Sequence, residues 1–449
     1  EIILNAIIKN INNELIVKDE NELTFLGKID SLQFFLLVMY YKNIPDNQIS
    51  DYFKQYFNIT GDKSTHYRNF IYEKFRFIID RYDDIRIDIN DLEFKFKKIY
   101  LDKVRNFTPN KIVISLTNKC MYDCKYCYAH NNRINKTLSF SDIKSIIDYC
   151  KYIGVKSIDF TGGDPLMRSD FFQILDYLEE NNIKVNFSTK IILNQCDVVK
   201  LCNYQCIESF QYSLDSLYQD EQIMLVPNLS VKKTLKFIES ISKSKKYFKF
   251  KVNSVITQFN INRILDLSDK LFDLKVDNHG LSPYTFSFGI NNDEYFATKE
   301  QYMKLSNKIK KYKYKNKLIY PITLTEEYSI DNEILCNAGV DGLVINYDGE
   351  VYVCERMCGF KELSVGNIYL TSIAEIWNGD KIKKFSNPDT EFFKNSQCCT
   401  CENLYECKDK RGICYVHSKI LNGEIYSPDN YCIYKYNKYN RRLTKYENS

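Results

Sequence analysis

The sequence lacks the features of a membrane or secreted protein. Its 449 residues contain no run of 18 or more apolar residues, so no membrane span is expected. The first twenty residues lack a basic segment, a long apolar segment and a small-residue cleavage site, so no secretory signal is predicted. The first residue is Glu rather than Met, and we expect a few residues to be missing or trimmed there. We therefore expect a cytoplasmic protein without a membrane partner.

The sequence also lacks a strong net charge. The 62 basic and 58 acidic residues leave a formal charge of +4, too small to attract nucleic acid. Over residues 1–100 there are 14 Lys and Arg against 16 Asp and Glu. A DNA-binding module should present a basic face, so no nucleic-acid partner is predicted.

Cysteine is absent before Cys120 and then abundant. Of the 16 cysteines, four lie in 120–150, three in 196–206 and nine in 336–432. A secreted disulfide scaffold is normally short and spreads its cysteines through the domain. Clustered thiols in a cytosolic chain instead indicate metal or iron–sulfur ligands.

The length is suited to two or three domains, and we expect units at 1–95, 96–310 and 311–449. The sequence of the first unit predicts a hairpin over 14–28, with a turn at Asp19–Asn21. It then predicts three helices, at 31–42, 47–57 and 65–79. A hairpin with three short helices is typical of a winged-helix-like domain. Residues 84–110 are predicted to be a linker.

Residues 111–290 alternate between strand and helix patterns. Strands are predicted at 111–117, 156–163, 184–190, 207–215, 248–257 and 284–290. Helices are predicted between them at 140–154, 169–182, 195–204, 231–243 and 261–274. Such alternation favours a parallel sheet built from right-handed βαβ units, here an α/β partial (β/α)6 barrel. Ligands bind such sheets at the C-terminal ends of the strands.

Three cysteines follow the first of these strands directly, as Cys120-x3-Cys124-x2-Cys127. A four-iron cubane needs four ligands, so three thiolates leave one iron open to a small molecule. The alternative is a zinc knuckle completed by His130.

The second strand ends in DFTGGDP, residues 159–165. Its glycines allow a ligand to approach the backbone closely, and Asp164 can accept hydrogen bonds from an ammonium group. The alternative interpretation is a simple turn between a strand and a helix.

Together these residues resemble the radical S-adenosylmethionine (radical SAM) superfamily, over roughly 108–290. The family motif Cys-x3-Cys-x-aromatic-Cys is matched with Tyr126 as the aromatic residue, and Gly-Gly-Glu-Pro is matched with Asp164 in place of Glu. The resemblance implies that Cys120, Cys124 and Cys127 hold a [4Fe–4S] cluster whose free iron binds SAM. Reductive cleavage of SAM would give a 5′-deoxyadenosyl radical that abstracts hydrogen from a C–H bond.

The resemblance also implies the contacts of SAM. Tyr126 would lie near the adenine, Gly163 and Asp164 would bind the methionine amine, and Ser213 with Asp215 would contact polar groups. A turn-capping role for Ser213 and Asp215 is the alternative. The predicted cofactor-binding residues are Tyr126, Gly162, Gly163, Asp164, Ser213 and Asp215. The family often adds a downstream Arg, but 216–250 contains none, and Lys190 is the substitute that the sequence offers.

The cysteines after 336 resemble the SPASM extension of radical SAM enzymes, which holds auxiliary [4Fe–4S] clusters. The order is Cys, Gly-x4-Cys, Cys-x2-Cys-x5-Cys, then two further cysteines, although Cys407 to Cys414 leaves six residues where the family has three. By position, one cluster would take Cys398, Cys401, Cys407 and Cys432, and the other would take Cys336, Cys354 and Cys414. A further family cysteine is replaced by Ile330, so either Cys358 is the fourth ligand or the site is open to a substrate thiolate.

Three further expectations concern the C-terminal region and the remaining cysteines. Residues 336–432 have too little apolar periodicity for a normal core, which predicts that metal helps this region to fold. The remaining cysteines, Cys150, Cys196, Cys202, Cys206 and Cys399, are predicted to be buried structural thiols. Glu355, directly after Cys354, is a candidate catalytic base by resemblance, and a solvated surface Glu is the alternative.

The first unit resembles the peptide-recognition element of enzymes that modify ribosomally made peptides. Such modules hold a leader peptide as an added strand, here between the strand at 22–28 and the helix at 65–79. The combination predicts a maturase that forms a thioether between a cysteine sulfur and a carbon of a precursor peptide, as in sactipeptides and ranthipeptides. It would use three [4Fe–4S] clusters, SAM and an electron donor such as flavodoxin or ferredoxin. The alternatives are a C–C crosslinking or formylglycine-forming SPASM enzyme and a non-enzymatic iron–sulfur redox sensor.

Overall fold

The computed structural model describes two long stretches and several shorter ones. The described residues are 5–11, 14–18, 23–28, 50, 69, 84–87, 109–129, 136–153, 155, 157–285, 287–288, 292–321, 336–386, 388–404, 407–408, 412–429 and 432. The three helices predicted within 31–79, the turn at Asp19–Asn21, His130 and Ile330 lie outside these residues.

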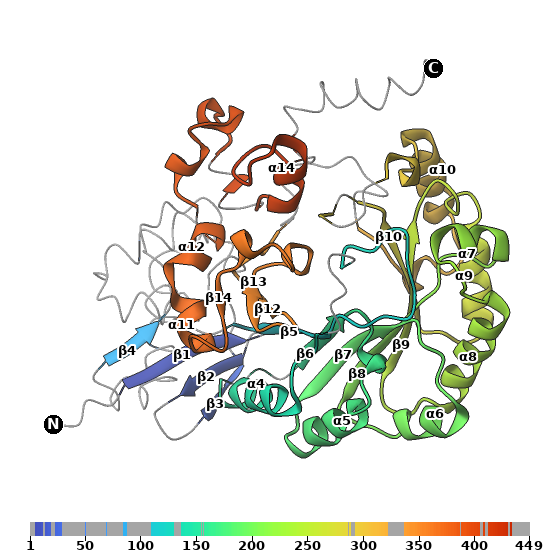
Figure 1. Cartoon of the computed structure of the whole chain (residues 1–449), viewed down its shortest axis with the longest axis horizontal. Helices are drawn as coiled ribbons and strands as arrows, with labels where there is room; N and C mark the ends of the chain where they lie inside the picture. The colour runs from blue at the N-terminus through green and yellow to red at the C-terminus, as the bar shows by residue number, and fades with distance from the viewer. Residues whose placement is uncertain are drawn as a thin grey trace.

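A curved, mostly parallel sheet forms the centre of the molecule (Figure 1). Its six successive parallel strands are β5 (Lys111–Thr117), β6 (Ser157–Gly162), β7 (Lys184–Thr189), β8 (Ile207–Ser213), β9 (Lys249–Ile256) and β10 (Asn278–Pro283). The strand order is linear, so the sheet stays open, as the prediction of a partial barrel required. In β5, six of seven residues are buried, because a central parallel strand is covered on both faces.

Helices cover the outer face of this sheet (Figure 1). They are α4 (Phe140–Tyr152), α5 (Phe171–Glu180), α6 (Gln195–Leu201), α7 (Gln219–Leu225), α8 (Val231–Ser244), α9 (Ile264–Asp273) and α10 (Lys299–Lys310). The five predicted helices are confirmed as α4, α5, α6, α8 and α9, whereas α7 was not predicted. Ser139 begins α4 with a capping box to Asp142, which satisfies the free N–H groups of the first turn.

The sixth strand was predicted in the wrong place. The pattern favoured 284–290, but β10 comprises Asn278–Pro283 and pairs in parallel with Lys251–Ile256 of β9. The sequence NHGLSP contains Gly and Pro, which are depleted in strands, while YTFSFGI is rich in strand-forming residues. Pairing with β9 and the burial of His279 and Leu281 outweigh this local preference.

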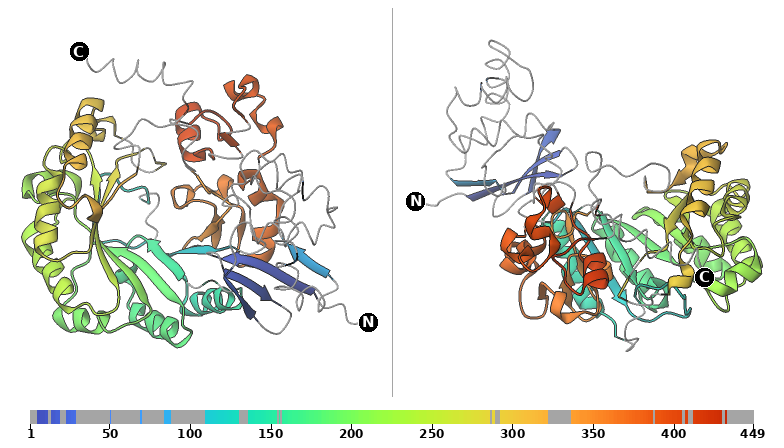
Figure 2. Two further views of the ribbon diagram at one scale, coloured as in Figure 1. Left: turned by 180° about the vertical axis from the view of Figure 1, so that it is seen from behind. Right: turned by 90° about the horizontal axis from the view of Figure 1, so that it is seen from above.

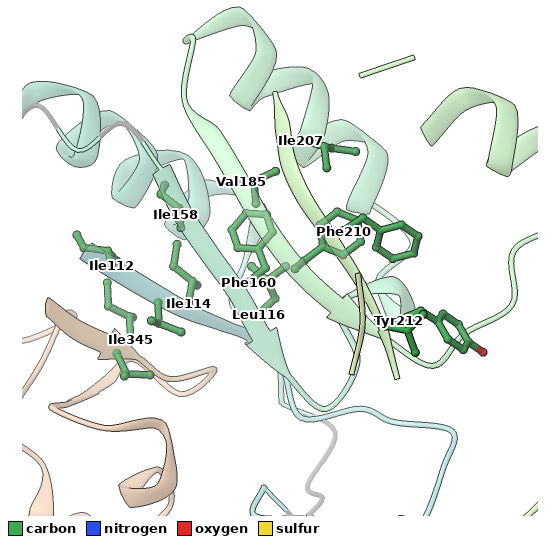
Figure 3. Close-up of a cluster of buried hydrophobic side chains, with 14 of the residues drawn as sticks. Ile112, Ile114, Leu116, Ile158, Phe160, Val185, Ile207, Phe210, Tyr212 and Ile345 are labelled. Atoms are coloured by element: carbon green, nitrogen blue, oxygen red, sulfur yellow. The ribbon is translucent and has the colours of Figure 1, made fainter. Parts of the chain in front are cut away.

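The sheet extends beyond the predicted barrel at both ends. At one end β11 (Leu318–Ile319) pairs with β10, and at the other β12 (Gly342–Ile345) pairs in parallel with β5. The strands β13 (Glu350–Tyr352) and β14 (Gly366–Asn367) then continue the sheet in antiparallel fashion. Figure 3 shows Ile345 of β12 in the same buried cluster as Ile112 and Ile114 of β5. Each fully buried Ile of this kind contributes about 1.5–3 kcal/mol.

The cysteine-rich region has its own short elements. They are α11 (Ile373–Asn378), α12 (Asp380–Ser386), α14 (Tyr415–Asn422), and short 3-10 helices at Glu355–Met357, Lys361–Leu363, Thr390–Phe393 and Gln397–Thr400. Trp377, Ile382 and Phe393 are fully buried and join the same hydrophobic cluster as the barrel. The expectation of a region without a normal core was therefore wrong, while its dependence on metal stays a prediction.

A separate four-stranded sheet lies near the N-terminus (Figure 2). The predicted hairpin is confirmed as β2 (Glu14–Lys18) and β3 (Leu23–Lys28), which pair antiparallel. Two strands were not predicted: β1 (Asn5–Ile11), and β4 (Asp84–Ile87) within the predicted linker. The four residues of β4 are too few to show a period, and their strand state depends on pairing with β1. Among the described residues, no helix is long and apolar enough to cross a membrane.

Candidate functional site

The chemically distinctive residues follow the C-terminal ends of four neighbouring strands. The cysteine loop follows β5, the Gly-Gly-Asp-Pro turn follows β6, Lys190 follows β7, and Asp215 lies two residues beyond β8. Because these parallel strands are adjacent, their ends lie along one edge of the sheet. Tyr126 and Asp215, which are 89 positions apart in the sequence, are thereby brought into hydrogen-bond contact.

The glycines of the second motif let the turn pack directly on the cysteine loop. The Gly163 N–H donates to the Thr117 carbonyl at 2.7 Å, and the Asp164 N–H donates to the Lys119 carbonyl at 2.8 Å. Gly162 has φ +127°, and a Cβ added to Gly163 would overlap the Lys119 carbonyl oxygen. The close approach therefore involves the backbone that leads into Cys120.

Asp164 is buried and its carboxylate is held by the protein. It accepts hydrogen bonds from the Thr189 hydroxyl at 2.7 Å, the Lys190 N–H at 2.9 Å and the Leu166 N–H at 3.1 Å. Burial raises the pKa of Asp164 above its usual value, while these hydrogen bonds act in the opposite direction. Asp164 thus fixes the end of β7 relative to the end of β6.

Tyr126, within the cysteine loop, contacts Asp215, which follows β8. The Tyr126 hydroxyl donates to Asp215 at 2.5 Å, and the other oxygen of Asp215 accepts the Val255 N–H at 2.9 Å. Burial raises the pKa of Tyr126 well above its usual value. Ser213 ends β8, paired with Asn253 of β9. Tyr126, Gly163, Asp164 and Asp215 therefore lie in or against the cysteine loop, while Gly162 and Ser213 end the strands β6 and β8.

The ammonium of Lys190 lies 5.5 Å from the centre of the Tyr126 ring. Burial lowers the pKa of Lys190, but the neighbouring Cys124 and Asp215 outweigh that effect and raise it. Burial raises the pKa of the Cys124 thiol to about 12. A metal cluster bound here would therefore release a proton from that thiol.

Glu355 links the C-terminal region to the barrel. Its carboxylate accepts a hydrogen bond from the Tyr128 hydroxyl at 2.6 Å, and the Thr161 hydroxyl lies 3.5 Å from the same oxygen. Tyr128 follows Cys127, and Thr161 precedes the two glycines, while Glu355 follows Cys354. The Tyr128–Glu355 hydrogen bond thus joins residues 227 positions apart, one next to a barrel cysteine and the other next to a C-terminal cysteine.

The C-terminal cysteines fall into the two predicted sets. Burial, followed by the nearby Cys354 and Cys414, raises the pKa of Cys336 to about 12. In the same way burial raises the pKa of Cys398 to about 12, with contributions from the neighbours Cys432, Cys401 and Cys407. The first set has three members and the second has four.

Cys358 lies near the first set, since Cys354 and Glu355 add to the effect of burial in raising its pKa. Buried Asp429, which the sequence interpretation missed, connects the two sets. Its carboxylate accepts the Cys414 N–H at 3.0 Å and its carbonyl accepts the Cys432 N–H at 3.2 Å.

These donor sets fit iron–sulfur clusters in their chemistry, since thiolates are the usual ligands of such clusters. No three Cys, His, Asp or Glu side chains converge on one point suitable for a metal ion, within the part of the chain that the structure describes. A cubane places its irons at separate corners, so its thiolates need not converge in this way.

The predictions for the other cysteines are confirmed in part. Cys150, Cys202 and Cys206 are buried, as predicted for structural thiols. Cys196 and Cys399 are exposed, so their predicted burial was wrong. Cys196 lies in the first turn of α6, whose buried residues are Val198 and Leu201.

Sequence reasoning also missed Tyr128 and Thr161. The only sequence signal for Tyr128 was a second aromatic residue beside Cys127. The partner that gives it a role lies in the C-terminal region and could not be read from local spacing.

Two family models match parts of the sequence. Residues 114–271 match the radical SAM superfamily, and residues 336–407 match the iron–sulfur cluster-binding SPASM domain. The first match begins within β5 and ends in α9, so it covers five of the six parallel strands. The chain therefore contains a radical SAM domain followed by a SPASM domain, in the predicted order.

The chain is also similar to individual proteins and solved structures. An uncharacterised protein of Methanocaldococcus jannaschii is 27% identical over 277 residues, 57% of this chain and 88% of the relative. The S-adenosylmethionine-dependent nucleotide dehydratase of Selenomonas ruminantium is 30% identical over 176 residues, 36% of this chain and 62% of the relative. The crystal structure of Streptococcus suis SuiB bound to precursor peptide SuiA has a TM-score of 0.64 at 18% identity, and the match covers 95% of this chain and 98% of SuiB. This last likeness establishes the fold.

Proposed function

We propose that the chain is a radical SAM peptide maturase that joins a cysteine sulfur to a carbon atom of a ribosomally made precursor peptide. Three [4Fe–4S] clusters would be held by Cys120, Cys124 and Cys127, and by the two C-terminal sets. When bound, the first cluster and SAM supply a 5′-deoxyadenosyl radical that takes a hydrogen atom from the peptide. An external donor such as flavodoxin or ferredoxin would supply the electron for SAM cleavage.

The observation that most supports a crosslinking reaction is the grouping of the C-terminal cysteines into sets of three and four. A three-cysteine set leaves a position for a substrate sulfur, and Cys358 nearby is the alternative occupant. The similarity to SuiB over 95% of the chain, in a structure bound to a precursor peptide, supports a peptide substrate. The N-terminal sheet of four short strands is the proposed site of the leader, which would bind as an added strand.

The reaction must remove two hydrogens from the peptide. One leaves as a hydrogen atom on 5′-deoxyadenosine, while the thiol loses a proton and the new C–S bond releases one electron. The auxiliary clusters would accept that electron. Glu355 is the proposed base for the proton, because its carboxylate lies between the two cysteine-rich parts and Tyr128 holds it there.

Anaerobic reconstitution with iron and sulfide, followed by incubation with SAM and dithionite, tests the radical activity. We expect 5′-deoxyadenosine, and its absence from a preparation with full iron content would refute the proposal and favour an iron–sulfur sensor. The substrate test uses the small cysteine-containing peptide encoded beside this chain. Mass spectrometry should show the loss of two hydrogens and a thiol that no longer reacts with iodoacetamide. A product that loses two hydrogens with its thiols intact would identify a C–C crosslink instead.

A further inference from the structure

Arg356 connects two cysteine-bearing segments of the C-terminal region. It lies two residues after Cys354, in the short 3-10 helix Glu355–Met357, and its Nη1 donates to Nε2 of His417 at 3.3 Å. His417 follows Cys414 by three residues and belongs to the first turn of α14. The hydrogen bond between Arg356 and His417 therefore joins these two segments.

His417 is itself held in place from the barrel. It is only 1% exposed, and its Nε2 lies 2.7 Å from the hydroxyl of Thr285, two residues beyond β10. Because a guanidinium can only donate, Nε2 of His417 is the acceptor, and the Thr285 hydroxyl donates to the same atom. The position of the Arg356 charge is thus fixed, through a buried imidazole, by the end of a barrel strand.

The positive charge of Arg356 acts on the three-cysteine set, which consists of Cys336, Cys354 and Cys414. Burial raises the pKa of Cys354, and that of Cys414 to about 11, and the Arg356 guanidinium opposes burial at both thiols. At Cys398, in the four-cysteine set, the group that opposes burial is the neutral hydroxyl of Ser396. The cation therefore belongs to the three-cysteine set.

Arg356 makes no ion pair with a carboxylate, among the residues that the structure describes. The adjacent carboxylate of Glu355 accepts the Tyr128 hydroxyl, whereas Arg168 and Arg263 of the barrel both pair with carboxylates. A guanidinium stays charged at any physiological pH, and a charge partly removed from water is costly without a partner. An anionic cluster at the three-cysteine set would supply that partner.

We propose that Arg356, held by His417, raises the reduction potential of the cluster bound at the three-cysteine set. The inference rests on the proposed function, in which these cysteines hold an auxiliary cluster that takes up an electron. A nearby positive charge stabilises an added electron, and the potentials of iron–sulfur clusters depend on the charge of their site. Arg356 thus favours reduction of this cluster by the electron that the new C–S bond releases.

The test is a redox titration followed by electron paramagnetic resonance, on reconstituted protein without SAM or peptide. The signal of this cluster is the one that Cys414→Ala lacks. Arg356→Gln keeps an N–H donor for His417 but removes the charge, so we expect a lower midpoint potential for this cluster and unchanged potentials for the others. Arg356→Lys keeps the charge and should stay closer to wild type. The control Lys361→Met removes a charge from an exposed side chain of the same region and should shift none of them.

An unchanged midpoint potential in Arg356→Gln, with the cluster assembled, would overturn this inference. A potential that changes only after peptide is added would also overturn it, because the charge would then act on the substrate. If Arg356→Gln does not assemble the cluster, Arg356→Lys decides: assembly with Lys supports a need for the charge, and failure with Lys shows a structural role instead. A wild type without any signal that depends on Cys414 would refute the cluster assignment of the proposed function, and this inference with it.

Discussion

Replacing Tyr128 by Phe removes one hydroxyl from the contact between the barrel and the C-terminal region. That hydroxyl donates to Glu355 at 2.6 Å and lies 3.2 Å from the Thr161 hydroxyl. Among the described residues, the Glu355 carboxylate then keeps the 3.5 Å contact with the Thr161 hydroxyl as its one side-chain hydrogen bond. The ring and its packing are unchanged, so the perturbation is confined to the position and hydrogen bonding of one carboxylate.

The size of the effect follows from this geometry. A hydrogen bond to a charged group is worth about 1.5–3 kcal/mol. Because 1.4 kcal/mol corresponds to a factor of ten, loss of this bond in a step that needs Glu355 should slow that step roughly tenfold to a hundredfold. The Asp215 and Lys190 side of the cysteine loop is untouched, so the yield of 5′-deoxyadenosine should be kept.

The assay measures crosslinked peptide and 5′-deoxyadenosine in the same reaction. Tyr128→Phe should lower the ratio of crosslink to 5′-deoxyadenosine, and Glu355→Gln should lower it at least as far. The matched control is Tyr247→Phe, which removes a hydroxyl from a side chain that is 55% exposed. An unchanged ratio in Tyr128→Phe, or an equal fall in both products, would refute the positioning of Glu355 by Tyr128.

Three further predictions concern stability and metal content. Burial lowers the pKa of His279 from 6.5 to about 3. Below pH 6.5 the unfolded chain therefore binds a proton at His279 that the folded chain does not bind. The free energy of unfolding should therefore fall by roughly 1.4 kcal/mol per pH unit between pH 6 and pH 4, and His279→Gln should reduce that slope in urea titrations. Gly163→Ala should displace the cysteine loop, because its Cβ would overlap the Lys119 carbonyl, and iron analysis should show the loss of one cluster; full iron content would contradict this. Cys414→Ala should likewise lose one cluster's iron, whereas the exposed Cys196→Ala should lose none, and equal loss in both would argue against the assigned set.

Motifs and most barrel elements could be predicted because their signals are local. The spacing of Cys120, Cys124 and Cys127, the turn at Gly162–Pro165 and the apolar period of α4 are properties of a few consecutive residues. Five of six barrel strands were placed correctly for the same reason. The sixth failed because NHGLSP has little strand preference of its own and depends on pairing with β9.

The sequence by itself therefore determined the class of chemistry, since ligand type and spacing are fixed along the chain. Only the tertiary structure decided which distant groups meet. Pairing of β12 with β5 brings the C-terminal region onto the barrel and lets Glu355 reach Tyr128. Adjacency of β5, β6 and β7 places Lys190 beside the ring of Tyr126. Such contacts depend on strand order and burial summed over the whole sheet, which no local pattern records.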